Sequence, residues 1–348
     1  MHAPLKFMAC ALLLLAGLYC AGCAAERKSL KALPSELVWP MPPDEPRIQY
    51  LFSISKPEDI GYAPSFFSKA LSLVTGPGDS VQLVRPYGIF STPEDVVYVA
   101  DPGLKIVHAF DMKRSSYSQI TSYKDRALQS PIGITMDDSR RLYVSDSLLK
   151  RIFVFSDTGK PLMEIGADDK LLRPTGLAFH SVHKWLYVTD TLGHCVHVFD
   201  RDGTLLNTFG SRGTAEGTFN FPTAIAFDRE GNVYVNDSLN FRIQIFKPDG
   251  TFVSLFGKHG DGMGEFSSPK GISLDSEGNI YIADAIFDAV QIFNRSGALL
   301  LSFCEAGTGP GALWLPSSIF IDQADRIFIA DSYNQRVQVF KFLGGNNL

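Results

Sequence analysis

The chain has 348 residues, of which 45% are hydrophobic, 20% charged and 12% aromatic, and its formal net charge is −5. This composition is typical of a folded globular protein and excludes an intrinsically disordered chain. The acidic balance also argues against nucleic acid as a partner, because phosphate backbones are bound by clustered lysine and arginine side chains.

Residues 1–22 are predicted to be an export signal. Lys6 precedes an apolar run over residues 7–19, which is short for a bilayer-spanning helix, and two small residues precede Cys23. The ending CAGC resembles the lipobox of bacterial lipoproteins, in which the cysteine after the cleavage point is acylated. This resemblance implies lipid attachment at Cys23, and Ala24 favours the outer membrane if the organism has one. The alternatives are simple secretion and an uncleaved anchor.

Three segments separate this signal from the first repeat. Residues 23–46 are polar and then rich in proline, which is typical of a tether. Residues 47–55, RIQYLFSIS, alternate as a strand does. Apolar residues at helical spacing predict an amphipathic helix over residues 64–75, which we expect to pack on the folded domain rather than on a membrane.

Six repeats follow, and three landmarks keep their spacing in them. The first is an aspartate that recurs every 44 to 47 residues: Asp101, Asp146, Asp190, Asp237, Asp284 and Asp331. A proline stands fifteen residues before five of these and sixteen before the third: Pro86, Pro131, Pro174, Pro222, Pro269 and Pro316. A phenylalanine stands nine residues after each aspartate: Phe110, Phe155, Phe199, Phe246, Phe293 and Phe340. Matches that stay in phase over six units indicate a repeat architecture.

Each unit is predicted to contain four antiparallel strands, named A to D here. In residues 221–257 the alternating runs AIAF, NVYV, RIQIF and TFVSLF are separated by turn-forming residues. The landmark proline begins strand A, the aspartate ends strand B and the phenylalanine lies on strand C.

The repeats resemble the NHL family, with its pattern Pro-x-Gly-Ile, Tyr-Val-x-Asp-Ser and Arg-Ile-x-x-Phe. The chain reads PIGI, YVSDS and RIFVF in the second unit and PTAI, YVNDS and RIQIF in the fourth. The resemblance implies an all-β fold, a six-bladed β-propeller over residues 47–343 whose blades start near residues 84, 129, 172, 220, 267 and 314. The last unit ends without a fourth strand, so residues 47–55 are expected to complete it and close the ring, which removes exposed sheet edges.

The aspartates could form a metal or acid/base site, but a structural role is favoured. An aspartate at a turn accepts hydrogen bonds from the backbone two residues on. In three units an arginine follows five residues later, at a suitable distance for an ion pair: Arg151, Arg242 and Arg336.

No catalytic residues and no cofactor or metal site are predicted. His180 and His183 supply only two ligands, and His194 lies about one strand length away, roughly 15 Å at 3.3 Å per residue. Cys195 and Cys304 fall in non-neighbouring units, so no disulfide is expected. The glycine-rich links between units lack the strand-to-helix context of a phosphate-binding loop.

The turns between strands B and C are unusually apolar, and they form the predicted partner-binding rim. Its residues are Leu104, Leu148, Leu149, Leu192, Leu239, Phe241, Ile286, Phe287 and Tyr333. Exposed apolar patches tend to mark binding sites, whereas side chains tucked between blades would carry no such meaning. The sequence therefore predicts a membrane-tethered, non-catalytic propeller that binds a protein or other ligand of the cell envelope through this face. The alternative is a metal-dependent hydrolase or lyase with a site at the central channel.

Overall fold

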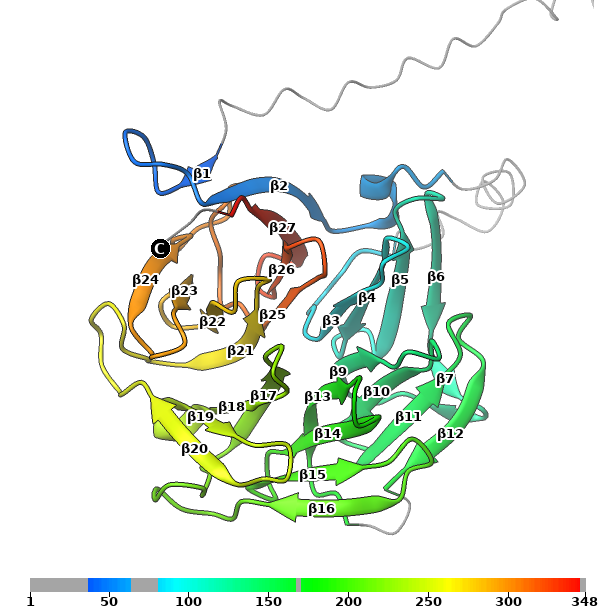
Figure 1. Ribbon diagram of the computed structural model, residues 1–348. Helices are drawn as coiled ribbons and strands as arrows, with labels where there is room; N and C mark the ends of the chain where they lie inside the picture. The colour runs from blue at the N-terminus through cyan, green and yellow to red at the C-terminus, as the bar shows by residue number, and fades with distance from the viewer. Residues whose placement is uncertain (1–36, 64–80, 167–169, 345–348) are drawn as a thin grey trace, which may run out of the picture. The chain divides into compact units, whose positions relative to one another are not determined.

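The computed structural model describes residues 37–63, 81–166 and 170–344. Six blade sheets surround a central channel, and the described residues also form a seventh, two-stranded sheet (Figure 1). The fold is therefore the predicted six-bladed, all-β propeller. The helix predicted over residues 64–75 lies outside the described residues. No helix within the described part of the chain is long and apolar enough to cross a membrane.

The first three blades are built from consecutive antiparallel strands, with A innermost. Blade 1 consists of β3 (Ile89–Ser91), β4 (Val96–Asp101), β5 (Ile106–Asp111) and β6 (Ser116–Ile120). Blade 2 consists of β9 (Pro131–Met136), β10 (Leu142–Asp146), β11 (Arg151–Phe155) and β12 (Pro161–Ile165). Blade 3 consists of β13 (Pro174–His180), β14 (Trp185–Asp190), β15 (Cys195–Phe199) and β16 (Leu205–Phe209). A small hairpin of β7 (Ser122–Tyr123) and β8 (Arg126–Ala127) links blades 1 and 2.

Blades 4 and 5 repeat this order, and blade 6 departs from it. Blade 4 consists of β17 (Pro222–Phe227), β18 (Val233–Asp237), β19 (Arg242–Phe246) and β20 (Phe252–Phe256). Blade 5 consists of β21 (Pro269–Leu274), β22 (Ile280–Asp284), β23 (Ala289–Phe293) and β24 (Leu299–Phe303). Blade 6 has β25 (Ser318–Ile321), β26 (Arg326–Asp331) and β27 (Arg336–Phe342) from the end of the chain. Two short 3₁₀ helices are η1 (Pro57–Ile60) and η2 (Ser238–Asn240).

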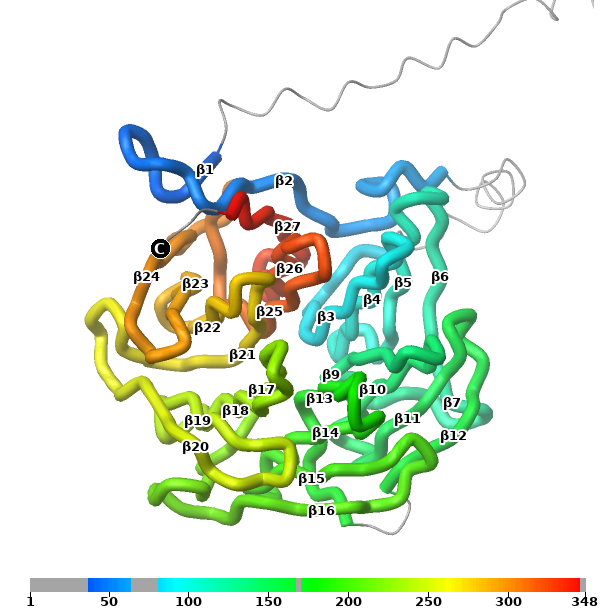
Figure 2. Tube along the Cα trace, viewed as in Figure 1, coloured from blue at the N-terminus to red at the C-terminus, as the bar shows by residue number. Residues whose placement is uncertain are grey.

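The ring is closed by β2 (Ile48–Ile54), as predicted from residues 47–55. This strand pairs antiparallel with β27, with Ile48 opposite Phe342 and Ile54 opposite Val337. Figure 2 shows the two segments side by side although they come from opposite ends of the propeller. This pairing places a strand from the start of the propeller in the same sheet as the last strands of the chain, so the outer edge of β27 is covered by backbone hydrogen bonds.

Blade 6 also has a fifth strand, β1 (Val38–Trp39), which pairs with the outer edge of β2. It lies within the segment expected to be a tether. The Trp39 ring contacts the ring of Phe340, with centroids 5.8 Å apart. A two-residue strand has no alternation to detect, so the sequence pattern contained no sign of it.

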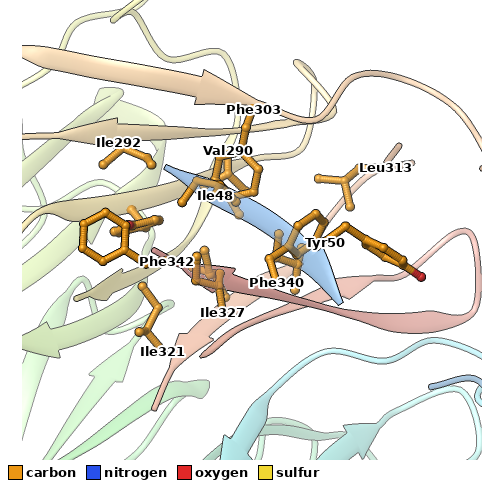
Figure 3. Packing of buried hydrophobic residues seen from close by; sticks show 14 residues of the cluster. Ile48, Tyr50, Val290, Ile292, Phe303, Leu313, Ile321, Ile327, Phe340 and Phe342 are labelled. Carbon is orange, nitrogen blue, oxygen red and sulfur yellow. The ribbon is translucent and has the colours of Figure 1, made fainter. Parts of the chain in front are cut away.

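The core consists of apolar layers between neighbouring blades. The six landmark phenylalanines of strand C are all buried, and each contributes about 1.5–3 kcal/mol of burial free energy. At the closure, Ile48 and Tyr50 of β2 pack with Phe340 and Phe342 of β27 and with Phe303 of blade 5 (Figure 3). The closing strand is therefore held by side-chain packing as well as by its ladder.

The innermost strands contact one another around the whole ring, in the order β3, β9, β13, β17, β21, β25 and back to β3. Glycine in strand A permits this approach. A Cβ atom built on Gly88 would lie 2.1 Å from the Ile132 carbonyl oxygen, and one on Gly133 would lie 2.0 Å from the Thr175 carbonyl oxygen. These positions exclude any side chain while the blades keep their spacing.

Candidate functional site

The six repeat aspartates are fully buried at the ends of the B strands. In every blade the carboxylate accepts a hydrogen bond from a backbone N–H at the end of the link that leads into strand A. In blade 2, Asp146 accepts bonds of 2.7 and 3.1 Å from Gln129 and Ser130, and of 3.2 and 3.0 Å from Leu148 and Leu149. The aspartate thus fastens the link to strand A and the B–C turn to each other.

Two of these carboxyl groups have a pKa below the ordinary aspartate value. Burial alone would raise the pKa of Asp101, but the His108 ring, 3.7 Å away, and the backbone N–H groups of Val84 and Arg85 lower it by a larger amount. Burial would likewise raise the pKa of Asp190, but the His197 ring, which lies 3.7 Å away, and backbone N–H groups lower it. Hydrogen bonds to the charged form favour ionisation, which suits a structural acceptor and not a general acid.

The B–C turns share a backbone feature that the sequence pattern does not reveal. The fourth residue after each aspartate has a left-handed conformation with φ between 50° and 61°, and none of the six is glycine: Lys105, Lys150, His194, Phe241, Asp288 and Gln335. Such a conformation is unfavourable for residues with a Cβ atom. The aspartate's bonds to the turn offset that strain, and the turn sets which side chains point outward.

Two of the three predicted arginine partners form an ion pair within their own blade. Arg242 Nε lies 2.8 Å from Asp237 Oδ2, and Arg336 Nε lies 2.8 Å from Asp331 Oδ2. The same arginines donate to carbonyl oxygens of the preceding glycine-rich link. Arg151 donates to the Lys150 carbonyl oxygen at 2.9 Å.

The glycine-rich links are held by strand C of the following blade. In blades 4, 5 and 6 a glutamine accepts a hydrogen bond from a glycine N–H of the link: Gln244 from Gly217, Gln291 from Gly264 and Gln338 from Gly311. These links are loops packed on the propeller, and their N–H groups are used internally. His108 and His197 occupy the glutamine position in blades 1 and 3 and bond through Nδ1 to the hydroxyl groups of Tyr117 and Thr208.

Hydroxyl groups that follow the aspartates connect neighbouring blades, a role that sequence reasoning missed. Each donates to the carbonyl oxygen of the proline that begins strand A of the next blade, at 2.5 to 2.9 Å. The pairs are Ser147 to Pro174, Thr191 to Pro222, Ser238 to Pro269 and Ser332 to Pro86. In the sequence, these hydroxyl residues directly follow the repeat aspartate as Asp-Ser or Asp-Thr in four of the six units.

The candidate histidines of blade 3 divide between its two ends, with His180 and His183 at the A–B turn and His194 in the B–C turn. His180 and His183 are neighbours, with ring centroids 4.7 Å apart, and burial together with the charge of His183 lowers the pKa of His180. His194 accepts a hydrogen bond from the Phe221 N–H. Among the described residues, no three His, Cys, Asp or Glu side chains lie together as metal ligands do. Cys195 and Cys304 are both free.

The predicted rim divides into exposed and partly buried side chains. One exposed apolar residue comes from each blade, and the exposed fraction runs from 38% for the first to 70% for the second: Leu104, Leu148, Leu192, Leu239, Ile286 and Tyr333. Leu149 and Phe241 pack against the core layers of blades 2 and 4, and Phe287 is half-buried. Each B–C turn therefore contributes one outward-pointing side chain to the rim.

Three further exposed apolar residues lie beside these turns and were not predicted. They are Val84, Leu172 and Trp314, each of which donates its backbone N–H to the repeat aspartate of its own blade. The Trp314 ring lies 5.7 Å from the Tyr333 ring, measured between centroids. We call the nine exposed residues of this face the apolar collar. Val84, Leu172 and Trp314 share one feature of the sequence, because each stands two positions before the proline that begins strand A.

Comparison with known families agrees with this geometry. A family model described as a 6-bladed beta-propeller matches residues 225–290, and the NHL repeat model matches residues 313–340. The chain carries NHL repeats on a six-bladed β-propeller. A search of curated proteins found no match to this NHL-repeat propeller.

Solved structures similar to the NHL-repeat propeller differ in their activities. A virginiamycin B lyase from Staphylococcus aureus has a TM-score of 0.56 at 14% identity, over 75% of this chain and 96% of the lyase. A gluconolactonase from Xanthomonas campestris has a TM-score of 0.59 at 17% identity, over 84% and 98%. An auxiliary nutrient binding protein from Bacteroides thetaiotaomicron has a TM-score of 0.57 at 12% identity, over 75% and 70%. At these identities the likeness shows the fold alone.

Proposed function

We propose that this NHL-repeat propeller is a lipid-anchored, non-catalytic binding protein of the cell envelope that holds a protein partner on the apolar collar. The observation that carries the proposal is the exposure of apolar side chains from all six blades on one face. Contiguous exposed apolar surface on a soluble domain tends to mark an interaction site.

The two faces of the propeller differ in a way that supports this assignment. On the face opposite the collar, the A–B turns are polar and charged, with sequences such as DDSRR in blade 2 and DREGN in blade 4. Among the described residues of these turns, Val182 is the one large apolar side chain that is exposed. Nine of the exposed large apolar side chains of the described residues therefore lie on the collar face, and others lie on the outer D strands, such as Leu162, Leu206 and Val253.

The composition of the collar favours a protein as its partner. Trp314 and Tyr333 lie in ring contact and half exposed, and tryptophan and tyrosine are enriched among the residues that contribute most to protein–protein affinity. Aliphatic residues from the other blades surround this pair. The arrangement suits an apolar surface of a partner protein that covers several blades.

The collar can be tested by site-specific photo-crosslinking in envelope preparations. A photoreactive residue in place of Leu148 or Ile286 is expected to capture the same protein, and Tyr333→Glu is expected to abolish that capture. The control position is Val182, which is 77% exposed on the opposite face. Equal capture at all three positions, or none at any, would contradict the proposal.

The anchor is tested separately. Cys23→Ala is expected to move the protein from the membrane fraction to the soluble fraction, because acyl chains provide the membrane affinity. Cys10→Ala serves as the matched control, since that residue lies in the apolar run of the predicted signal and outside the CAGC ending, so the variant should stay in the membrane fraction. Unchanged partitioning of Cys23→Ala would contradict lipidation at this residue.

A further inference from the structure

The fifth residue after the landmark proline has the same role in five of the six blades. It is a large apolar residue that packs into the layer between its own blade and the preceding blade, next to the A–B turns. The five residues are Met136, Phe179, Phe227, Leu274 and Ile321. Blade 1 has Ser91 at this position. The layer between blades 6 and 1 therefore has a small polar side chain where each of the other layers has a large apolar one.

A cavity lies where blades 6 and 1 meet, and we call it the seam cavity. The innermost strands of these blades, β25 and β3, are neighbours in the ring (Figure 1). The cavity has a volume of about 560 Å³, and Ser91 lines it together with apolar groups of Phe90, Pro93, Phe320 and Ala324. The half-buried rings of Phe90 and Phe320 lie against each other, with centroids 5.0 Å apart and planes tilted by 47°. A cavity of this size with an aromatic wall is typical of small-molecule sites.

Ser91 contributes a buried polar group to this apolar wall. Its side chain is 4% exposed, and no group among the described residues forms a hydrogen bond with its hydroxyl oxygen. The hydroxyl oxygen of the neighbouring Thr92, by contrast, accepts the Val96 N–H at 3.2 Å. A buried hydroxyl group without a partner is destabilising, and most such groups in proteins are hydrogen-bonded. A molecule in the seam cavity that carries its own hydroxyl group can supply the partner.

The charged groups of the seam cavity compensate one another. Arg326 lies between Asp95 of blade 1 and Asp322 of its own blade, and its guanidinium nitrogens are 2.7 Å from a carboxylate oxygen of each. All three residues line the cavity. Two carboxylates around one guanidinium leave a single negative charge, which disfavours an anionic ligand. Because both carboxylates are already paired, the site suits an uncharged molecule.

We propose that the seam cavity binds a small, uncharged aromatic compound that carries a hydroxyl group, a compound of the phenol class. The ring of the ligand packs against Phe90 and Phe320, since aromatic rings favour tilted contacts with one another. Its hydroxyl group forms a hydrogen bond with Ser91. A site of this kind discriminates against the analogue that lacks the hydroxyl group, because the buried partner is then left unpaired. The cavity lies at the A–B turns, on the face opposite the apolar collar, so the proposal is independent of the protein partner.

Fluorine NMR of para-fluorophenol in the presence of the purified full-length protein tests the site. Saturable binding that unlabelled phenol displaces is expected. Fluorobenzene, which has the same ring without the hydroxyl group, should bind roughly five- to tenfold more weakly. Para-fluorobenzoate should also bind more weakly than para-fluorophenol, because its negative charge meets that of the Asp95, Arg326 and Asp322 group.

Three variants at two repeat positions assign the binding to the seam cavity. Ser91→Ile introduces the apolar residue that the other blades have and should abolish binding. Its melting temperature should equal or exceed that of the wild type, because the variant removes an unpartnered hydroxyl group and buries apolar surface. Ser91→Ala keeps the cavity and should bind para-fluorophenol and fluorobenzene equally. Met136→Leu is the matched control, a volume-conserving change at the same repeat position of blade 2, and should bind as the wild type does.

A further variant fills the cavity from its exposed side. Ala324 lies in the A–B turn of blade 6 and is exposed, so Ala324→Leu should weaken binding without disturbing the core. If Ser91→Ile does not fold, Ala324→Leu decides the question by the same criterion.

The remaining outcomes are distinct. No displaceable binding by the wild type, or equal binding by the wild type and the cavity-filling variants, would overturn the proposal. A preference for para-fluorophenol over fluorobenzene that persists in Ser91→Ala would overturn the role of the hydroxyl group. Tyr333→Glu should bind para-fluorophenol as the wild type does even if it abolishes partner capture, which separates this result from the collar hypothesis.

Discussion

Replacing Gly133 with alanine would place a methyl group against the backbone of the neighbouring blade. The new Cβ atom would lie 2.0 Å from the Thr175 carbonyl oxygen and 3.0 Å from the Ser145 hydroxyl oxygen. The carbonyl group cannot turn away freely, because the Ser145 hydroxyl donates to it at 2.7 Å and accepts the Gly133 N–H at 2.8 Å. The clash can be relieved only if blades 2 and 3 move apart.

The expected loss of stability follows from two opposing effects. Overpacking a close-packed interior costs about 1–3 kcal/mol, and a clash with backbone belongs at the upper end of that range. Alanine in place of glycine restricts the unfolded chain and so returns roughly 0.4–1 kcal/mol. Gly133→Ala should therefore lower the free energy of unfolding by about 2 kcal/mol.

Urea unfolding followed by circular dichroism would measure this loss. Gly309→Ala is the matched control, because a Cβ atom at Gly309 meets nothing within 4 Å and the residue does not have a positive φ. That variant should unfold at the wild-type urea concentration or slightly above it. Wild-type stability in Gly133→Ala, or an equal loss in both variants, would refute the account of blade crowding.

Three further predictions concern the contacts around the repeat aspartates. Ser147→Ala removes the 2.6 Å bond to the next blade and should cost about 1 kcal/mol in urea unfolding, whereas the exposed Ser296→Ala should cost nothing measurable. The folded-state pKa of Asp190 is lowered, so its carboxylate adds stability that is present above the ordinary value of 3.8 and is lost as pH falls through the folded-state pKa. Asp190→Asn should therefore flatten the decline of unfolding free energy below about pH 4, and an unchanged slope would contradict this. Arg242→Gln should speed hydrogen exchange in the link over residues 213–218, while the exposed Arg229→Gln should not.

The sequence by itself determined the number of blades and the course of the chain through them. Proline, aspartate and phenylalanine keep their spacing because each performs a local task in every unit: starting strand A, fastening the B–C turn and filling the layer between blades. Residues 47–55 could be assigned to the last blade for the same reason, since the sixth unit lacked a strand whose pattern was known from the others. Because the same local interactions recur in every unit, six repeats in the sequence predict a ring of six blades.

The direction of the side chains on the collar face could not be predicted in this way. The sequence placed Leu148 and Leu149 on the same turn, yet the first is exposed and the second packs on the core of blade 2. That difference depends on the left-handed backbone conformation of Lys150. The sequence does not indicate this conformation, because the residue is not glycine. Tertiary contacts hold the turn in this strained conformation, and the direction of each side chain follows from it.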